Sequence, residues 1–388
     1  MNYLCLSPHF PPNYINFSQR LKDCGANVLA IGSEPYDDLP QTLKEALTEY
    51  YRVDSLEDYD SLVRACGFFV HRYGRLNRVE SHNEHWLFTD AKLRSDFNVP
   101  GLKAEDMGTI KYKSRMKELF QKAGVPVARG RVIISKEEAL ALIDETGYPV
   151  CAKPDSGVGA AHTYKLKSEE DLDRFFAVKP PLDYIMEEFI EGEIHTFDGL
   201  TDGDGRVVFQ NSYVFDRGVM ETVNDNLDMF YHNQRVIPED LLDYGLRVVE
   251  AFQLKERFFH IEFFRTGEGK LIVMEVNVRP PGGWSMDLFN IATERDLYLT
   301  YAQLVTGQPT EPINLTPYHV AYAGLKQGEG VHHVHSQEEI LTRYGHLVIH
   351  HGPIDSIFAP AIGNYAYVLR AEELEPLKDA AEFILERD

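Results

Sequence analysis

The hydrophobic pattern of the N-terminal part predicts an open parallel α/β sheet. Short apolar runs at Tyr3–Ser7, Asn27–Ile31 and Gly67–His71 have the composition of buried strands. A helical stretch from Tyr14 to Cys24 separates the first two runs, and strands that alternate with helices favour a parallel sheet. The first strand leads into the Pro-rich segment Ser7–Pro12 instead of a glycine fingerprint, so the pattern does not favour a dinucleotide-binding site.

The sequence pattern changes near Pro100, where a second structural unit that mixes helices and strands is predicted to begin. Its first helix is basic and amphipathic and ends at Gly124-Val125-Pro126, which is typical of a helix stop followed by extended chain. The predicted elements are a helix at Lys111–Ala123, a strand at Val132–Ile134, a helix at Lys136–Glu145 and a strand at Tyr148–Lys153.

Strands dominate after Tyr184, and two hairpins are predicted from their turns. We expect Ile194–Thr201 to pair with Arg206–Tyr213 across a turn rich in Asp and Gly. We expect Phe259–Arg265 to pair with Leu271–Arg279 across Thr266-Gly267-Glu268-Gly269. A mixed tail follows Gly307, with a strand at Tyr365–Leu369 and a helix at Glu372–Leu385.

Strand alternation in Leu271–Arg279 places three polar side chains on one face. The odd positions carry Glu275, Asn277 and Arg279, whereas the even positions are uniformly apolar and suited to a core. With Arg265 opposite Lys270, Glu262 becomes a diagonal neighbour of Glu275. Two carboxylates and an amide oxygen suit Mg²⁺, and the arginine suits a phosphoryl group. A surface ion-pair cluster is the alternative, and a slip of one residue would move Glu262 to the other face.

Two further segments carry features of a nucleotide site. The segment from Lys153 to Ala161 follows a strand and is rich in small residues, so its backbone N–H groups could approach phosphate oxygens beside the lysine charge. It lacks the Gly-Lys-Ser/Thr of a Walker loop, and a flexible turn is the alternative. Tyr184–Glu193 is an apolar strand that ends in carboxylates and could flank an adenine and meet ribose hydroxyls; an ordinary strand-to-turn transition is the alternative.

Composition and charge narrow the classes of partner. The 388 residues carry a net charge of −22, which argues against nucleic acid and anionic membranes because phosphate backbones demand clustered cations. No apolar run reaches the ~18 residues of a membrane span, and the N-terminus lacks the pattern of a secretory signal. The 4 cysteines are scattered without a C-x-x-C pair. We therefore expect a cytoplasmic protein that binds neither nucleic acid nor membrane.

The order of these segments resembles the ATP-grasp superfamily, particularly its carboxylate–amine ligases, and is similar to the L-amino acid ligases. The resemblance covers about Lys111 to Pro281 and, more loosely, the whole chain. Its matching segments are Lys113 ahead of the helix that closes at Ala123–Pro126, Lys153 before the small-residue loop, Glu187–Glu193 (EEFIEGE), His260–Arg265 (HIEFFR) and Met274–Gly283 (MEVNVRPPGG).

The resemblance implies a role for each candidate residue. Lys113 and Lys153 would contact the ATP phosphates, and Glu262, Glu275 and Asn277 would hold one or two Mg²⁺ ions, with Mn²⁺ as an alternative. Arg279 and Lys153 would act on the transferring group. The nucleotide would also meet the loop residues Ser156, Gly157, Val158, Gly159 and Ala160, the adenine contacts Glu187, Phe189 and Ile190, and Glu193 at the ribose. Relatives often have Gly-x-Glu at the ribose position, whereas Glu193 directly follows Gly192.

The implied fold combines α/β and α+β parts. It comprises an N-terminal Rossmann-like parallel-sheet domain, an ATP-grasp core of two subdomains, and a C-terminal subdomain. The expected boundaries are 1–105 for the N-terminal domain, 106–186 for the small lid subdomain, 187–310 for the large subdomain with the metal site, and 311–388 for the C-terminal subdomain.

The implied activity is formation of an amide or peptide bond through an acyl phosphate, with release of ADP and phosphate. A carboxylase that uses bicarbonate and a catalytically silent ATP-binding module are the alternatives. The expected partners are a small carboxylate and an amine, and a homodimer is compatible with the sequence. Candidate substrate contacts are Arg279, Gly282, Gly283, Glu221 and Trp284.

Several histidines and one polar segment have a functional and an ordinary interpretation. His332, His333 and His335 could bind zinc but have no nearby cysteine, and we interpret them as a solvated surface tract. His195 and His260 lie in strands beside the expected cleft, where either could be a hydrogen-bonded core histidine. The segment with Arg72, Glu80, His82 and Glu84 could meet a substrate or form a salt-linked loop.

Overall fold

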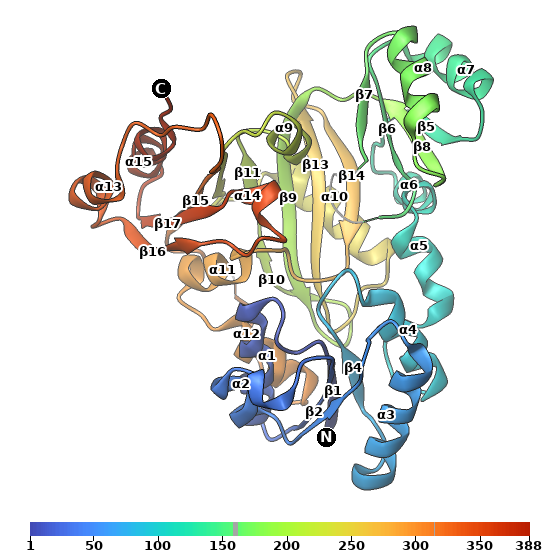
Figure 1. Ribbon diagram of the computed structural model, residues 1–388, viewed down its shortest axis with the longest axis vertical. Helices are drawn as coiled ribbons and strands as arrows, with labels where there is room; N and C mark the ends of the chain where they lie inside the picture. Colours follow the sequence, from blue (N-terminus) through green and yellow to red (C-terminus); the bar gives the residue numbers. More distant parts are fainter. Residues whose placement is uncertain (158–161, 314) are drawn as a thin grey trace.

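The computed structural model describes residues 1–157, 162–313 and 315–388, and of Val219 and Glu221 it describes the backbone alone. Three sheets organise this part of the chain (Figure 1). No helix within it is long and apolar enough to cross a membrane.

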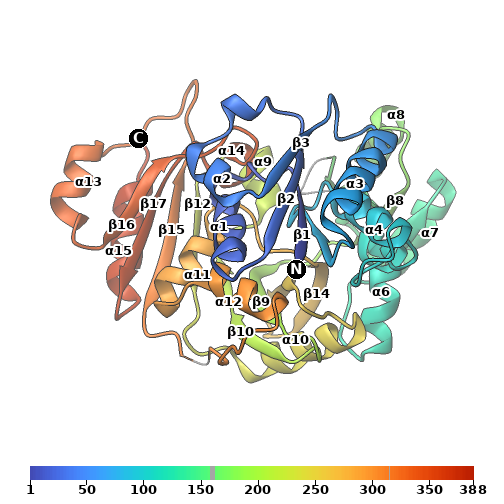
Figure 2. The same ribbon diagram turned by 90° about the horizontal axis from the view of Figure 1, so that it is seen from below.

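The N-terminal sheet is parallel, as the alternation of strands and helices predicts. Its four strands lie in the order β3-β2-β1-β4. Helices α1 and α2 lie on one side of it and α3 and α4 on the other (Figure 2). The strands are β1 (Asn2–Leu6), β2 (Asn27–Gly32), β3 (Glu49–Arg52) and β4 (Arg78–Glu80), and the helices are α1 (Ile15–Asp23), α2 (Gln41–Ala46), α3 (Tyr59–Tyr73) and α4 (Leu87–Asp96).

The strand predicted at Gly67–His71 is wrong, because this segment lies within helix α3. The buried residues of α3 are Leu62, Ala65, Cys66 and Phe69, which follow the i, i+3, i+4, i+7 spacing of a helix. The short apolar run around Phe69 is therefore one turn of a longer amphipathic pattern.

The small sheet is antiparallel and forms a separate layer at the upper right of Figure 1. Its order is β5-β8-β6-β7, and helices α7 and α8 pack against it over a core that includes Leu142, Leu172 and Phe175. Its strands are β5 (Gly130–Ile133), β6 (Val150–Pro154), β7 (Tyr164–Leu166) and β8 (Tyr184–Glu188), and its helices are α7 (Lys136–Thr146) and α8 (Glu169–Val178).

The helix predicted at Lys111–Ala123 is interrupted at Tyr112. That residue has extended dihedral angles (φ −102°, ψ 117°) and separates α5 (Met107–Lys111) from α6 (Lys113–Lys122). The break places Lys113 at the first position of α6, close to the end of strand β6.

The large sheet runs through the rest of the molecule, with nine strands among the described residues. Its order is β14-β13-β9-β11-β12-β15-β17-β16, and β10 pairs with β9. The strands are β9 (Gly192–Thr201), β10 (Val207–Asn211), β11 (Tyr213–Phe215), β12 (Met229–Asn233), β13 (Phe258–Thr266), β14 (Leu271–Asn277), β15 (His319–Leu325), β16 (Val348–Pro353) and β17 (Tyr365–Ala371). The associated helices are α9 (Val219–Asn224), α10 (Glu239–Ala251), α11 (Ser285–Thr293), α12 (Leu297–Val305), α13 (Gln337–Tyr344), α14 (Ala359–Ile362) and α15 (Glu375–Leu385). Both predicted hairpins are present, as β9–β10 and β13–β14.

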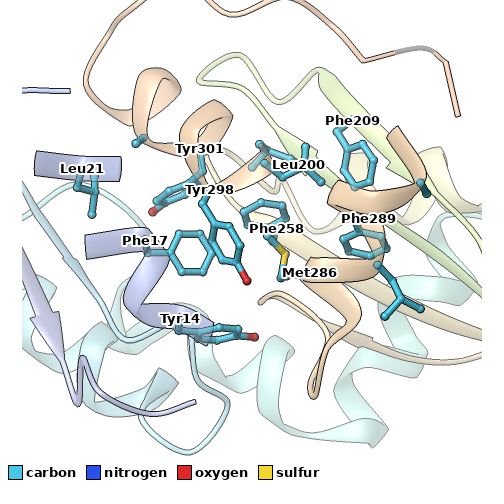
Figure 3. Packing of buried hydrophobic residues seen from close by; sticks show 14 of the residues in the cluster. Tyr14, Phe17, Leu21, Leu200, Phe209, Phe258, Met286, Phe289, Tyr298 and Tyr301 are labelled. Carbon is cyan, nitrogen blue, oxygen red and sulfur yellow. The ribbon is translucent and has the colours of Figure 1, made fainter. Parts of the chain in front are cut away.

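An aromatic core joins the N-terminal sheet to the large sheet. Phe17 of α1 packs edge-on against Phe258 of β13 and against Tyr298 and Tyr301 of α12 (Figure 3). The same cluster continues from Leu21 to Leu200, and all these side chains are buried. Because aromatic side chains bury large areas, this core holds the N-terminal sheet firmly against the strands that carry the candidate site.

The division into 1–105, 106–186, 187–310 and 311–388 stays a prediction. Strand β8 completes the small sheet and extends two residues beyond 186. Strands β15, β16 and β17 continue the sheet that contains β9, β13 and β14. The last two segments therefore share one sheet.

Candidate active site

A cleft of about 540 Å³ lies between the small sheet and one end of the large sheet. Strands β6 and β8 form one wall, and β13 and β14 form the other. Its apolar lining includes Phe189, Ile190, Phe264, Ile272 and Met274, and its charged lining includes Lys113, Lys153, Glu187, Glu262 and Glu275. A mostly apolar cavity with a few convergent charged groups is the usual form of a small-molecule site.

A β-bulge at Met274 corrects the predicted register of the β13–β14 hairpin. Arg265 pairs with Leu271 instead of Lys270, and beyond Met274 Glu262 lies directly opposite Glu275. The turn shifts the pairing by one residue and the bulge shifts it by another. Glu262 and Glu275 therefore share a face as direct neighbours and are not diagonal to one another.

Because of the same bulge, the two faces of β14 differ from the predicted ones. Leu271 and Val273 are buried in the core with Val276, whereas Ile272, Met274 and Glu275 line the cleft. An extra residue in one strand reverses the alternation beyond it. The cleft face of β14 is therefore apolar at one end and acidic at the other.

Glu262, Glu275 and Asn277 are brought together as the proposed metal site requires. The amide nitrogen of Asn277 donates to a carboxylate oxygen of Glu275 at 3.2 Å, which leaves the amide oxygen for another partner. No cluster of three His, Cys, Asp or Glu side chains in the described part of the chain forms a metal cage. Two carboxylates and one amide nevertheless fit Mg²⁺, which takes few protein ligands and completes its shell with water and phosphate oxygens.

Nearby lysines keep Glu275 ionised. Lys113 Nζ lies 3.4 Å from Glu275 Oε2. Burial alone would raise the pKa of this carboxyl, but Lys113 and Lys153 outweigh burial and lower its pKa to about 2. The carboxylate is therefore negatively charged throughout the neutral pH range.

The start of α6 is fixed by the end of strand β6. The backbone N–H of Lys113 donates to the carbonyl of Asp155 at 2.8 Å. The Asp155 carboxylate accepts from the backbone N–H and the hydroxyl of Ser114, each at 2.7 Å. An acceptor at a helix N-terminus satisfies an otherwise unpaired N–H group. This contact couples Lys113 to the loop that follows Lys153.

Lys153 and Lys117 share the carboxylate of Glu187. Lys153 Nζ lies 2.8 Å from Glu187 Oε2, and Lys117 contacts the other oxygen. Burial favours the neutral amine, yet Glu187 raises the pKa of Lys153 above its usual value. The two lysines in turn lower the pKa of Glu187 against the effect of burial. Glu187 therefore holds Lys153 in the cleft wall.

The small-residue loop is only partly described. Ser156 and Gly157 line the cleft, and Gly157 has an extended φ of +159°. Val158, Gly159 and Ala160 lie outside the described residues. Lys165, which follows this loop, places its ammonium group 3.6 Å from the ring centroid of Phe189.

The structure brings Phe189 and Ile190 into the cleft but not Glu193. Glu191 and Gly192 line the cleft instead. Glu193 is largely exposed, and its carboxylate lies 3.5 Å from His195 Nε2. Strand alternation explains this, because Ile194 faces the cleft and both its neighbours face away.

Arg279 lies just beyond β14 and contacts the N-terminal domain. Its Nε donates to Glu84 Oε2 at 3.3 Å, and Lys111 Nζ lies 2.5 Å from the other oxygen of Glu84. Glu84 and Glu80 were predicted as either substrate contacts or members of a salt-linked loop. Both take part in salt links, because Glu80 pairs with Arg257 at 2.6 Å.

The remaining candidate substrate residues lie around the start of α11. Gly283 has a φ of +62°, and a side chain there would approach Ile362 to 2.7 Å. Gly282 faces Phe358, and the ring of Trp284 lies 4.5 Å from that of His350. The side chain of Glu221 lies outside the described residues.

The predicted histidines lie in two places, His333 and His335 near the C-terminal helix and His195 and His260 in strands of the large sheet. His333 pairs with Asp228 at 3.1 Å and His335 with Glu386 at 2.9 Å, so each has a carboxylate partner. His195 faces away from the cleft and lies 3.3 Å from Gln234. His260 lies on the same face of β13 as Glu262, between the carboxylates of Asp198 and Glu262.

Three residues of the site were not singled out from the sequence. Lys117 follows Lys113 by four residues and shares its helix face, which was a usable signal. Asp198 lies directly opposite His260 and belongs to a strand that was predicted correctly. Glu191 could not be distinguished from Glu193 without knowing where strand β9 begins.

The fold and the cleft together define the class of this chain. A small antiparallel sheet that carries Lys153 lies across the cleft from a large sheet that carries Glu262 and Glu275, and this arrangement agrees with the resemblance described above. Residues 146–287 match the model of the ATP-grasp domain family. The chain therefore contains an ATP-grasp domain.

Individual proteins are also similar to this chain in sequence. The chain is 25% identical over 273 residues to the L-arginine-specific L-amino acid ligase of Bacillus subtilis, covering 64% of this chain and 65% of the relative. It is 32% identical over 216 residues to the 2-oxoglutarate carboxylase small subunit of Hydrogenobacter thermophilus, covering 51% and 44%. The matches thus span less than two thirds of each curated relative.

The fold extends over the whole chain. The crystal structure of the L-amino acid ligase from Bacillus licheniformis superposes with a TM-score of 0.74 at 16% identity. The match covers 100% of this chain and 98% of that one. The likeness shows that the two chains share the ATP-grasp fold.

Proposed function

We propose that this protein is an ATP-dependent carboxylate–amine ligase. It forms an amide or peptide bond between a small carboxylate and an amine and releases ADP and phosphate. The observation that carries the proposal is the convergence of Lys113 and Lys153 on the carboxylates of Glu187 and Glu275 within one cleft. Similarity to an L-amino acid ligase over 64% of the chain supports it.

The nucleotide lies along the cleft with its base at the apolar end. Phe189 and Ile190 contact the adenine through the backbone, and the side chains of Ile272 and Met274 pack against its face. Glu191 is the better candidate for the ribose hydroxyls, because Glu193 faces away from the cleft. Ser156 and the loop residues that follow it bind the phosphates, and the ammonium groups of Lys113 and Lys153 offset their charge.

The proposed reaction has two steps. A carboxylate oxygen of the first substrate attacks the γ-phosphorus of ATP, and ADP leaves with the electrons of the broken phosphorus–oxygen bond. The amine then attacks the carbonyl carbon of the acyl phosphate, the carbon–oxygen bond to phosphate breaks, and the leaving phosphate takes up the proton that the nitrogen loses. No side-chain nucleophile of the chain is required.

The chain contributes orientation and electrostatic stabilisation. Glu262, Glu275 and Asn277 would hold Mg²⁺, which would offset negative charge at the phosphates. Arg279 binds the transferring phosphoryl group through its planar guanidinium. The backbone N–H groups of Gly282 and Gly283 lie next in the chain and are candidates for the acyl phosphate oxygens.

A carboxylase that phosphorylates bicarbonate is the second candidate. It would use the same nucleotide residues, and the 32% identity to the 2-oxoglutarate carboxylase small subunit favours it. It differs from the ligase in the nature of the carboxylate and the acceptor. A silent ATP-binding module is disfavoured by the retention of Glu262, Glu275, Asn277 and Arg279.

ADP release separates these candidates. Purified protein is incubated with ATP, Mg²⁺ and pairs of amino acids or other carboxylates and amines, and products are identified by mass. Release that requires both a carboxylate and an amine supports the ligase, whereas release that requires bicarbonate supports the carboxylase. ATP binding without release under any condition would contradict both activities.

A further inference from the structure

His260 lies in a two-by-three array of side chains across strands β9, β13 and β14. In one row Asp198, His260 and Asn277 are directly paired, and in the next row Thr196, Glu262 and Glu275 are directly paired. Directly opposed residues in neighbouring antiparallel strands lie close enough for their side chains to interact. His260 therefore completes a square whose other three corners are the proposed metal ligands.

Both ring nitrogens of His260 are engaged by carboxylates. Nδ1 lies 2.5 Å from Asp198 Oδ1, and Nε2 lies 3.0 Å from Glu262 Oε1. Each carboxylate oxygen is an acceptor, so the imidazole donates from both nitrogens. A ring that donates from both nitrogens has no lone pair for a metal, and His260 is therefore not itself a ligand.

Further hydrogen bonds hold Asp198, which contacts His260 on the side away from Glu262. The hydroxyl of Thr196 donates to Asp198 Oδ2 at 2.5 Å, and the backbone N–H of Tyr213 donates to that hydroxyl at 2.9 Å. Asp198 and Thr196 are fully buried. The chain of contacts runs from the backbone of β11 through Asp198 to His260, and ends at Glu262 on the surface of the cleft.

We propose that His260 is a positioning residue that orients Glu262 for binding a divalent cation, with Asp198 as its support. The inference rests on the proposed function because it takes Glu262 as a metal ligand. A single rotatable carboxylate would otherwise adopt several orientations, and the fixed imidazole selects one of them. Partners of this kind behind a ligand typically change metal affinity by about 10–100-fold when they are removed.

Two substitutions at His260 separate positioning from general packing. The amide nitrogen of Asn falls near the position of Nδ1, so His260→Asn keeps a donor to Asp198 and loses the donor to Glu262. The amide nitrogen of Gln falls near the position of Nε2, so His260→Gln keeps the donor to Glu262. His85 forms a comparable imidazole–carboxylate contact with Glu57 at 2.8 Å on the exposed surface, so His85→Asn is the matched control.

The dissociation constant of Mn²⁺ from the full chain is measured in saturating ADP, and electron paramagnetic resonance gives the concentration of the free ion. We expect His260→Asn to weaken Mn²⁺ binding by about 10–100-fold. His260→Gln should weaken it less, and His85→Asn should match the wild type. ADP binding without a divalent cation should stay within about twofold in all variants, because the lysine contacts are untouched. Asp198→Asn takes the place of His260→Asn if that variant does not fold.

The outcomes distinguish this inference from the proposed metal site. Wild-type Mn²⁺ affinity in His260→Asn, together with lost affinity in Glu275→Gln, overturns the positioning role and leaves the metal site standing. Wild-type affinity in Glu275→Gln overturns the metal site and the inference with it. Equal losses in His260→Asn and His260→Gln also overturn positioning, because a donor to Glu262 would then make no difference.

Discussion

Replacing Glu187 by Gln removes the negative charge that Lys117 and Lys153 share. At 2.8 Å and an effective dielectric constant of about 20, the attraction between Lys153 and Glu187 is about 6 kcal/mol before desolvation is counted. The side chains of all three residues are at most 12% exposed, so solvent replaces little of this attraction. Removing one partner of a buried pair typically costs about 3–5 kcal/mol, and we expect Glu187→Gln to lower the free energy of unfolding by that amount.

A double-mutant cycle tests this reasoning. Lys117→Met alone should cost little, because Glu187 keeps its contact with Lys153. In the double variant Glu187→Gln, Lys117→Met only one ammonium group is left unpaired, so it should be more stable than Glu187→Gln. Urea unfolding measures stability, and calorimetry measures ADP binding, which should weaken in Glu187→Gln. An unfolding free energy within about 0.5 kcal/mol of the wild type in Glu187→Gln would refute the shared-charge interpretation.

Three further predictions concern other parts of the structure. Glu275→Gln should lower turnover by at least about 100-fold with unchanged circular dichroism, as measured by ADP release, whereas the exposed Glu268→Gln should have no effect. Burial opposes ionisation of Glu80, but Arg257 and Arg94 lower its pKa to about 2. Its contribution to stability, about 3 kcal/mol, is therefore complete above about pH 5 and is lost as the pH falls towards 2. The free energies of unfolding of wild type and Glu80→Gln, measured in urea, should converge at low pH. A difference between them that persists at low pH would contradict this prediction. Gly283→Ala should cost about 1 kcal/mol of stability, measured in urea, because φ there is +62°; a more stable variant would contradict it.

Much of the architecture follows from periodicity in the sequence. The parallel N-terminal sheet and both hairpins were predicted because each has clear alternation and recognisable turns. The segment around Phe69 was mistaken for a strand because a short apolar run fits a strand as well as one turn of a helix. The break at Tyr112 depends on a contact with Asp155, more than forty residues away in the chain, which local patterns do not contain.

The residues of the candidate site were easier to predict from the sequence than their arrangement in space. Lys113, Lys153, Glu262, Glu275 and Asn277 were chosen from the sequence, and the structure brings them together. Their roles stay predictions. The pairing of Glu262 with Glu275 was not predicted, because the turn and the bulge each shift the register by one residue and no residue type signals the bulge. Glu193 was placed at the ribose because the first residue of strand β9 was unknown.

The bulge at Met274 has a consequence for how this strand tolerates change. Without it, regular alternation over the same residues would place Leu271 and Val273 on the face that carries Glu275 and Asn277. The extra residue instead divides a single cleft face into two chemically different zones, one from Ile272 to Met274 and one from Glu275 to Asn277. Each zone can vary in sequence without disturbing the other. Deletion of Met274 would remove the bulge, leave Glu275 opposite Glu262 and take one apolar side chain out of the cleft, so the acidic zone would keep its place.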